Sequence, residues 1–264
     1  MAQLIMTRAY FTAATGAILL LKILSVNTPP KFFSTKNNIN NKYLILYNKY
    51  DSLQLNNKKK LRDTDRNAIS LTKEERSVFI GLLLSDAWLQ KRKGWNPRIG
   101  LKQSIKHFEF LWYTFIKLSK FCSNYPYLTK VFKRNKLFYS LTIQTRQLNC
   151  FKEIYELLYQ VPDNGKIKKV IKPELFDYID YIVIAYWIMG DGSKRNKGIV
   201  LCTDSFSLKE VILLINILFI KFDLNCTIHN DCNKYRIFIN KISFKKLLVH
   251  IKPYFTNNFL YKIS

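Results

Sequence analysis

The sequence predicts an α+β protein that consists of two similar halves. Apolar runs with helical spacing alternate with segments in which apolar and polar residues alternate singly, as they do in half-buried strands. The same order of segments occurs twice, and an aspartate, Asp86 or Asp191, ends an apolar helix in each copy. An extended segment follows each aspartate at an equivalent place, 98–101 in the first copy and 198–201 in the second. A repeat of this kind indicates internal pseudo-symmetry.

The composition favours a polyanionic partner. The chain has 264 residues, of which 48% are hydrophobic and 15% aromatic, so it can bury a core and does not resemble a disordered chain. Lys and Arg number 43 against 18 Asp and Glu, and they are spread from Lys22 to Lys262. The net charge of +25 predicts an extended nucleic-acid-binding surface. The alternative is a lysine-rich exposed surface caused by A/T-rich coding, although such coding does not explain the shortage of acidic residues.

The first 70 residues read as a lead-in. Residues 27–67 are rich in Asn, Lys and Pro, which predicts mostly irregular structure. The apolar stretch 11–24 is interrupted by Thr, Gly and Lys and is shorter than the roughly 20 residues that cross a bilayer, so we expect no stable membrane insertion. An import segment is compatible with it. The five cysteines contain no CxxC pair, which favours a reducing compartment.

The first half begins at a capping box. Thr72 and Glu75 precede the apolar run 78–84, which predicts a helix from there to about Ala87. An extended segment at 98–103 and a helix at 107–121 follow. Residues 137–144 alternate between apolar and polar side chains as a strand does, and a helix fits 148–159.

The second half repeats this order. We expect a helix at 181–189, an extended segment at 199–203, and a helix at 208–222 that Ser207 and Glu210 cap. A strand at 235–240 and a helix at about 244–251 complete the copy.

The two helix ends are the candidate chemical site. A helix C-terminus is partly negative, so Asp86 and Asp191 lie in an unfavourable place unless something offsets their charge. The small residues Gly81, Ser85 and Gly190 would let the two helices approach closely and bring both carboxylates together. Hard divalent cations favour such an oxygen cluster, and a metal pair on a basic protein implies phosphodiester hydrolysis. The alternative is that each aspartate is a solvated helix terminator.

Both helices resemble the signature helix of the LAGLIDADG homing endonucleases, in the single-chain form with two motifs. The matching segments are 79–87 and 184–192, and the resemblance covers about 71–262. Tyr186 and Trp187 depart from the first copy, which has Gly81 and Leu82 there. The resemblance implies an αββαββα unit in each of 71–170 and 171–264, with the motif helices at the interface and the sheets forming a saddle over DNA. It further implies a monomer that cuts both strands site-specifically across the minor groove.

The resemblance also implies roles for particular residues. Asp86 and Asp191 would bind Mg²⁺, helped by the main-chain carbonyls of Ser85 and Gly190. Lys169 and Lys262 would lie near the scissile phosphates, with plain phosphate anchoring or surface charge as the alternative. Polar strand faces in the major groove would read bases. The candidates are Lys102, Gln103, Gln144, Arg146, Asp204, Arg236 and Asn240.

Residues 7–15 are similar to a stretch of cytochrome oxidase subunit 1. This similarity suggests an intron reading frame that continues from an upstream exon, and it favours the mitochondrial matrix. Two alternatives to a homing endonuclease remain open. One is an intron maturase that binds intron RNA and assists splicing, and the other is a DNA-binding protein that does not cut.

Overall fold

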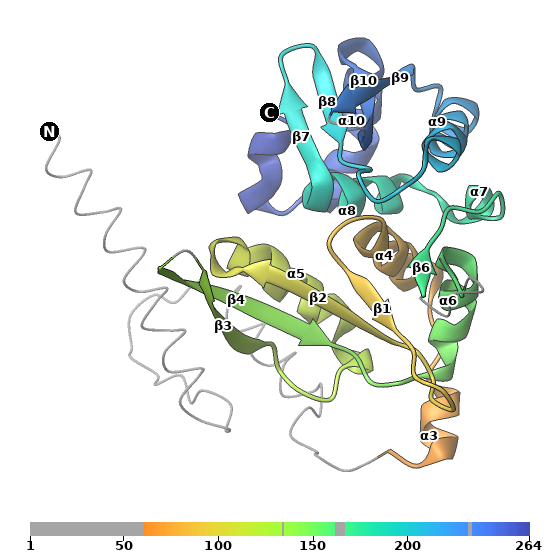
Figure 1. Cartoon of the computed structure of the whole chain (residues 1–264), viewed down its shortest axis with the longest axis vertical. Helices are drawn as coiled ribbons and strands as arrows, with labels where there is room; N and C mark the ends of the chain where they lie inside the picture. The colour runs from red at the N-terminus through yellow and green to blue at the C-terminus, as the bar shows by residue number, and fades with distance from the viewer. Residues whose placement is uncertain (1–60, 134, 162–166, 232–233) are drawn as a thin grey trace, which may run out of the picture. The chain divides into compact units, whose positions relative to one another are not determined.

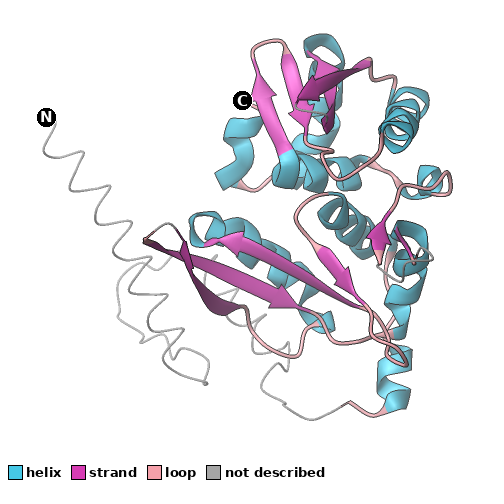
Figure 2. Cartoon of the chain, in the orientation of Figure 1, coloured by secondary structure: helices cyan, strands magenta, loops and turns pink. Residues whose placement is uncertain are grey.

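The computed structural model describes residues 61–133, 135–161, 167–231 and 234–264. Within them, helices and antiparallel strands alternate in two series of the same order (Figures 1 and 2). The first series is α4 (Lys73–Leu84), β1 (Trp88–Gln90), β2 (Arg98–Ser104), α5 (Phe108–Leu118), β3 (Tyr127–Lys133), β4 (Lys136–Gln144) and α6 (Lys152–Leu158). The second series is α8 (Tyr181–Asp191), β7 (Gly192–Arg195), β8 (Gly198–Leu201), α9 (Leu208–Phe222), β9 (Cys226–Asp231), β10 (Lys234–Asn240) and α10 (Lys241–Ile251). Each series is an αββαββα unit.

Short elements connect and extend the two series. They are α3 (Asp63–Ala68), η1 (Ile105–His107), η2 (Ser119–Phe121), η3 (Asn149–Phe151), β5 (Tyr159–Gln160), β6 (Lys168–Lys169), α7 (Leu175–Tyr178), η4 (Lys252–Tyr254) and η5 (Asn257–Lys262). No described helix has the length and apolarity that a bilayer crossing requires.

The two larger sheets have the same topology. Their strand orders are β1-β2-β4-β3 and β7-β8-β10-β9, and all neighbouring strands are antiparallel. Gly100 pairs with Gln144 in the first sheet, and Val200 pairs with Phe238 at the equivalent place in the second. In β2, Ile99 and Leu101 are buried, whereas Lys102 on the opposite face is exposed. Helices α5 and α9 contact the sheets, so each sheet has a helix-covered face and an open face.

Helices α4 and α8 pack against each other at the centre of the described structure (Figure 1). In α4, residues 77–84 are buried, and in α8, residues 183–189 are buried. A helix that is apolar all round is expected to be buried on all sides, which explains why these two helices, and not the amphipathic α5 and α9, occupy the middle.

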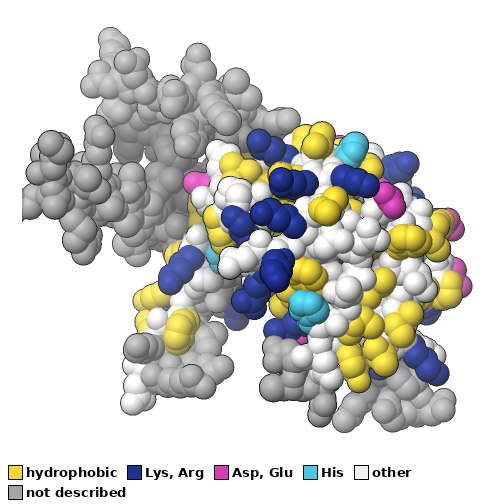
Figure 3. All heavy atoms as spheres, turned by 90° about the horizontal axis from the view of Figure 1, so that it is seen from above, with side chains coloured by type: hydrophobic (Ala, Val, Ile, Leu, Met, Phe, Trp, Pro, Cys, Tyr) yellow, Lys and Arg dark blue, Asp and Glu magenta, His cyan; other side chains and the backbone are white. Residues whose placement is uncertain are grey.

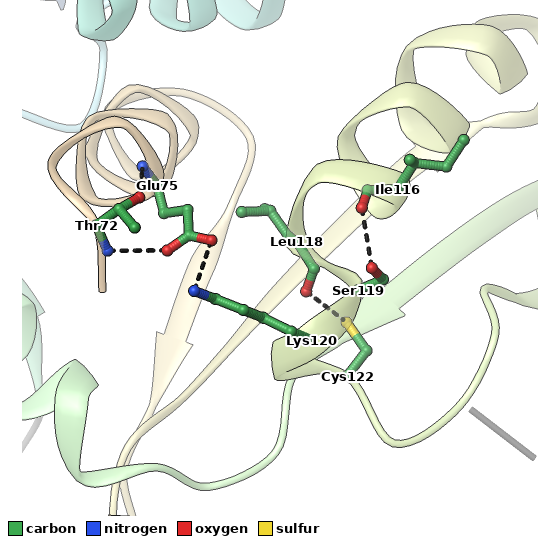
Figure 4. A network of polar contacts seen from close by, with 7 residues as sticks. All are labelled: Thr72, Glu75, Ile116, Leu118, Ser119, Lys120 and Cys122. Carbon is green, nitrogen blue, oxygen red and sulfur yellow. Dashed lines mark hydrogen bonds and ion pairs between the residues drawn. The ribbon is translucent and has the colours of Figure 1, made fainter. Parts of the chain in front are cut away.

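The predicted capping boxes are both present. Thr72 Oγ1 accepts from the backbone N–H of Glu75 at 3.2 Å, and the Glu75 carboxylate accepts from the backbone N–H of Thr72 at 2.9 Å. Lys120 of η2 also pairs with Glu75 at 2.8 Å, so the start of α4 is joined to the end of the α5 segment (Figure 4). Burial opposes the charged form of Glu75, but the bonds from Lys120 and Thr72 outweigh it and lower the pKa of this carboxyl. Ser207 and Glu210 make the second box at the start of α9.

Several predicted boundaries were wrong. Helix α4 ends at Leu84 instead of Ala87, because the chain turns there to enter β1. The helices predicted at 107–121 and 148–159 are broken into α5 and α6 with 3₁₀ turns at their ends, and β8 ends at Leu201. Residues 63–68 form α3 although we expected irregular structure, and Asp63 and Asp65 in its first turn favour a helix start. The segments 7–15 and 11–24, for which we made predictions, lie outside the described residues.

Candidate active site at the ends of the two central helices

Two glycines allow the central helices to approach closely, Gly81 against the backbone of α8 and Gly190 against the Ser85 side chain. A Cβ atom added at Gly81 of α4 would lie 2.6 Å from the carbonyl oxygen of Val183 and 2.7 Å from Cβ of Tyr186. One added at Gly190 of α8 would lie 2.3 Å from Oγ of Ser85. Real Cβ contacts are not this short, so each position accepts only glycine without a shift of the partner helix. The close approach that the small residues predict is therefore present, and Tyr186 packs directly over Gly81.

The approach brings the two aspartates together. Asp86 follows Ser85, the residue that caps the C-terminal end of α4, and Asp191 is the last residue of α8. The same added Cβ at Gly190 would be 3.4 Å from Oδ2 of Asp86, which places that carboxylate beside the residue before Asp191. Burial, and then the nearby charge of Asp86, raise the pKa of Asp191 to about 7. Asp191 is half-buried and so is not a fully solvated helix terminator, whereas Asp86 is exposed to solvent.

A lysine closes the C-terminal end of each central helix. Lys262 Nζ donates to the carbonyl oxygens of Met189 and Gly190 at 2.7 and 2.9 Å. Lys169 Nζ donates to the carbonyl oxygens of Leu83 and Ala87. A cation at this end complements the helix dipole and satisfies carbonyls that have no partner inside the helix. These ammonium groups supply the offset that carboxylates at a helix C-terminus require.

Both lysines are held away from bulk water. Lys262 is only 9% exposed and Lys169 is half-buried, so neither is a plain surface charge. Burial lowers the pKa of both, to about 8 for Lys169, while the charges of the two aspartates oppose this effect. The site therefore contains two carboxylates and two ammonium groups that interact electrostatically with one another.

Gln103 belongs to this site, although we expected it to be an exposed base-reading residue. It is 8% exposed, and its Nε2 donates to Oδ2 of Asp86 at 2.5 Å. Strand alternation explains the difference, because Gln103 lies on the same face of β2 as the buried Ile99 and Leu101. The equivalent residue of the second half is Thr203, whose Oγ1 donates to the carbonyl oxygen of Tyr235. The two halves of the site thus differ in their polar neighbours.

The other candidates for base contacts fall into four groups. Lys102 is exposed on the open face of β2, as expected. Asp204 and Arg236 bind each other through two bonds of 2.7 and 2.8 Å, which lower the pKa of Asp204. Asn240 caps α10, since its Oδ1 accepts from the backbone N–H of Ser243 at 2.8 Å, so this side chain has a structural partner that its prediction as a base contact did not include. Gln144 and Arg146 line a cleft at the end of the first sheet.

Two aromatic residues near Lys262 were not predicted. The ring of Phe259 in η5 stacks on His107 of η1, with centroids 5.0 Å apart, and lies 4.8 Å from Nζ of Lys262. Burial and the charge of Lys262 lower the pKa of His107. His107 comes from the first half and Phe259 from the second. A contact between residues so far apart in the sequence cannot be predicted from the residues next to either one.

Among the residues that the structure describes, no group of three or more His, Cys, Asp or Glu side chains could hold a metal ion. A cation at this site would rely on Asp86, Asp191 and main-chain oxygen. The carbonyl oxygen of Gly190 also accepts from Lys262, and Ser85 uses its hydroxyl to donate to the carbonyl oxygen of Gly81 at 3.1 Å. Carboxylate and carbonyl oxygens are the donor types that Mg²⁺ prefers, so the residues present fit that ion.

Known proteins resemble this chain over most of its length. The model of the LAGLIDADG DNA endonuclease family matches residues 76–247. Probable intron-encoded endonuclease 1 of Wickerhamomyces canadensis is 31% identical over 83% of this chain and 96% of that protein. Cytochrome b mRNA maturase bI2 of Saccharomyces cerevisiae is 30% identical over 85% of this chain, which spans about half (53%) of that maturase. Among solved structures, the homing endonuclease I-WcaI bound to its DNA recognition sequence gives a TM-score of 0.70 at 28% identity, covering 82% of this chain and 97% of that one.

Proposed function

Because the chain belongs to the LAGLIDADG DNA endonuclease family, we propose that it is a site-specific endonuclease that cuts both strands of a DNA duplex across the minor groove in intron homing. The observation that carries this proposal is the meeting of Asp86 and Asp191 where α4 and α8 end. The net charge of +25 supports a DNA partner, as does the similar fold of a homing endonuclease bound to DNA. On the face that Figure 3 shows, Lys and Arg side chains gather in a group while acidic side chains are few.

Asp86 and Asp191 would hold Mg²⁺, with main-chain oxygen of Ser85 and Gly190 nearby. When bound, the ion would neutralise charge on the scissile phosphate and lower the pKa of the attacking water. The chain's own groups prepare this chemistry. Gln103 orients the Asp86 carboxylate through its 2.5 Å bond, and helix-end carbonyls hold the ammonium groups of Lys169 and Lys262 in place. We infer that these two lysines stabilise the negative charge that develops on each phosphate.

Each strand would be cut beside one half of the site, so a single chain would supply both aspartates without a second copy. This arrangement supports a monomer and a division into a lead-in (1–70) and two repeats (71–170 and 171–264). The names of the relatives, which include cytochrome b mRNA maturases and intron-encoded endonucleases, support an origin in a mitochondrial intron and a location in the matrix.

The test is to incubate the protein and Mg²⁺ with a plasmid that carries the intronless version of its host gene, and to sequence the cut ends. We expect one double-strand break near the intron insertion site. Asp191→Asn should bind the same duplex with unchanged affinity but make no double-strand break. Unchanged cleavage by Asp191→Asn would overturn the proposal, as would binding without any cleavage by the unaltered protein.

A second candidate is a maturase that binds intron RNA, and two relatives named cytochrome b mRNA maturase bI2 favour it. Loss of the protein should then cause retention of its own intron. Normal splicing in its absence would exclude this activity and leave the nuclease proposal untouched.

A further inference from the structure

A cleft of about 390 Å³ opens at the outer end of the first sheet. It is lined by three arginines from three different segments, Arg66 of α3, Arg98 of β2 and Arg146 after β4. Trp95, 55% exposed, and Tyr127, 45% exposed, also line it. Large aromatic residues beside guanidinium groups are a combination that nucleic-acid-binding surfaces use repeatedly.

The positive charge of this cleft is poorly compensated. Arg98 donates to the neutral amide oxygen of Gln90 at 2.9 and 2.7 Å, and Arg146 donates to the carbonyl oxygen of Cys122 at 3.3 Å. In the described part of the chain neither pairs with a carboxylate. Arg66 reaches Asp63 at 3.9 Å, but the Asp63 side chain is 95% exposed, so this pair contributes little. Three fixed cations without a buried counterion favour an anion from solution.

Arg66 and Arg146 are close enough to affect each other. Burial lowers the pKa of Arg146, and the nearby positive charge of Arg66 lowers it further, although the guanidinium stays charged. Repulsion of this kind disfavours the cleft unless a negative group binds between the two side chains.

Strand register places the cleft on the face that the proposed function assigns to DNA. Arg98 and Lys102 are four residues apart in β2 and so lie on the same face of the sheet. Gln144 pairs with Gly100 between them, and Tyr127 pairs with Thr142, which is opposite Lys102. A duplex that lies on this open face therefore meets the cleft where the sheet ends.

The second half has a different cleft on its sheet, of about 750 Å³, lined by Lys194, Arg195, Lys197 and Arg236. By the register of the two sheets, Arg98 corresponds to Gly198, Gln144 to Phe238 and Arg146 to Asn240, which caps α10. The positions of Arg98 and Arg146 thus carry arginine in the first half alone.

Resting on the proposed function, we propose that the arginine cleft formed by Arg66, Arg98 and Arg146 binds a backbone phosphate of the DNA target beyond the stretch that lies on the first sheet. The guanidinium groups would donate to the phosphate oxygens, and Trp95 and Tyr127 would pack against the adjoining sugar or base.

The test compares the unaltered protein with Arg66→Gln in DNA binding without divalent metal, so that cleavage does not enter. The matched control is Lys209→Gln, which removes one exposed charge on α9, away from the open face. We expect Arg66→Gln to bind the intronless junction about tenfold more weakly. The slope of log Kd against log salt should fall by about one phosphate, with Arg66→Lys restoring the slope. Lys209→Gln should change neither quantity.

Two shortened duplexes locate the contact. A duplex that lacks the flank beyond the first half should bind Arg66→Gln and the unaltered protein equally, whereas removal of the opposite flank should keep the difference. Equal slopes for Arg66→Gln and Lys209→Gln would overturn the proposal, as would a difference that survives on both shortened duplexes. Inorganic phosphate binding that depends on Arg66, combined with an unchanged DNA slope, would show a small-anion site instead. If the unaltered protein binds no junction duplex, the proposed function itself fails.

Discussion

At the scale of single residues, the site pairs each carboxylate at a helix C-terminus with a nearby ammonium group. A carboxylate alone would be unfavourable there, because the helix C-terminus is itself partly negative. Lys262 and Lys169 donate to carbonyl oxygens at the ends of α8 and α4, and their charges also lie near Asp191 and Asp86. The lysines therefore offset part of the repulsion between the carboxylates and the negative helix ends. The remaining repulsion lowers the stability of the folded protein, and a bound metal cation would reduce it.

Replacing Asp191 with asparagine should stabilise the metal-free protein at high pH. The pKa of Asp191 is raised to about 7 by burial and by Asp86, so the folded protein binds a proton that the unfolded chain has released. Stability from this group is complete in acid and declines as pH rises through 7. Asp191→Asn does not ionise, so its advantage should reach roughly 1–3 kcal/mol above pH 7 and shrink toward pH 5. Urea unfolding at pH 5 and 8.5 measures it, with the exposed Asp177→Asn of α7 as control. An advantage of equal size at both pH values would contradict the assignment.

Tyr186 carries a buried hydroxyl without a hydrogen-bond partner among the described residues. The side chain is 0% exposed, and burial raises its pKa. Tyr186→Phe removes the unpaired hydroxyl and keeps the ring that packs near Phe110. We therefore expect the free energy of unfolding to rise by about 1 kcal/mol. Loss of stability in thermal or urea unfolding would show that the hydroxyl has a partner.

At the scale of elements, the contact between α4 and α8 determines where Asp86 and Asp191 lie. Gly81 faces Val183 and Tyr186, and Gly190 faces Ser85, so each helix presents a glycine to the other at a different level. This backbone contact is what carries Asp86 toward Asp191.

Gly81→Ala should separate the two helices. The added methyl group would meet the carbonyl oxygen of Val183 at 2.6 Å, a backbone atom that cannot turn aside. We expect a loss of about 1–3 kcal/mol in the free energy of unfolding, together with weaker cleavage. Asn216→Ala, at an exposed position of α9, is the control and should be near neutral. Unchanged stability of Gly81→Ala would mean that the helices are not in backbone contact.

The helices and long strands were predictable because their signals are local. The capping boxes at Thr72 and Ser207 and the alternation in 137–144 and 235–240 each lie within a few residues. Strands β1 and β7, of three and four residues, are too short for alternation to appear. The aspartate pair followed from the repeat, whereas the roles of the lysines required the family resemblance. The buried position of Gln103 could have been predicted, because Gln103 lies two and four residues from the apolar Leu101 and Ile99 and so shares their face of the strand. Its bond to Asp86 and the stack of His107 on Phe259 could not, because both depend on tertiary packing.

At the scale of the whole described structure, an aromatic contact joins the two halves. Phe259 of the second half is 2% exposed and packs against His107 and edge-on against Phe110 of the first half, with centroids 5.0 and 4.9 Å apart. The ring also lies under Lys262, so the packing between the halves supports the site directly.

Phe259→Ala should lower the free energy of unfolding of both halves together. We expect a loss of about 3–5 kcal/mol, with the transition remaining single because α4 and α8 share one core. Urea unfolding followed by fluorescence and by circular dichroism measures this, and the exposed Tyr261→Ala serves as control. Two separate transitions in the unaltered protein would contradict a shared core.

The most direct test of the account is an anomalous-scattering map of the protein bound to its DNA target in crystals grown with Mn²⁺ in place of Mg²⁺. Manganese is expected at the ends of α4 and α8, in contact with the carboxylates of both Asp86 and Asp191 and with the DNA backbone. Manganese that contacts neither aspartate, or carboxylates that point to opposite sides of the protein, would contradict it.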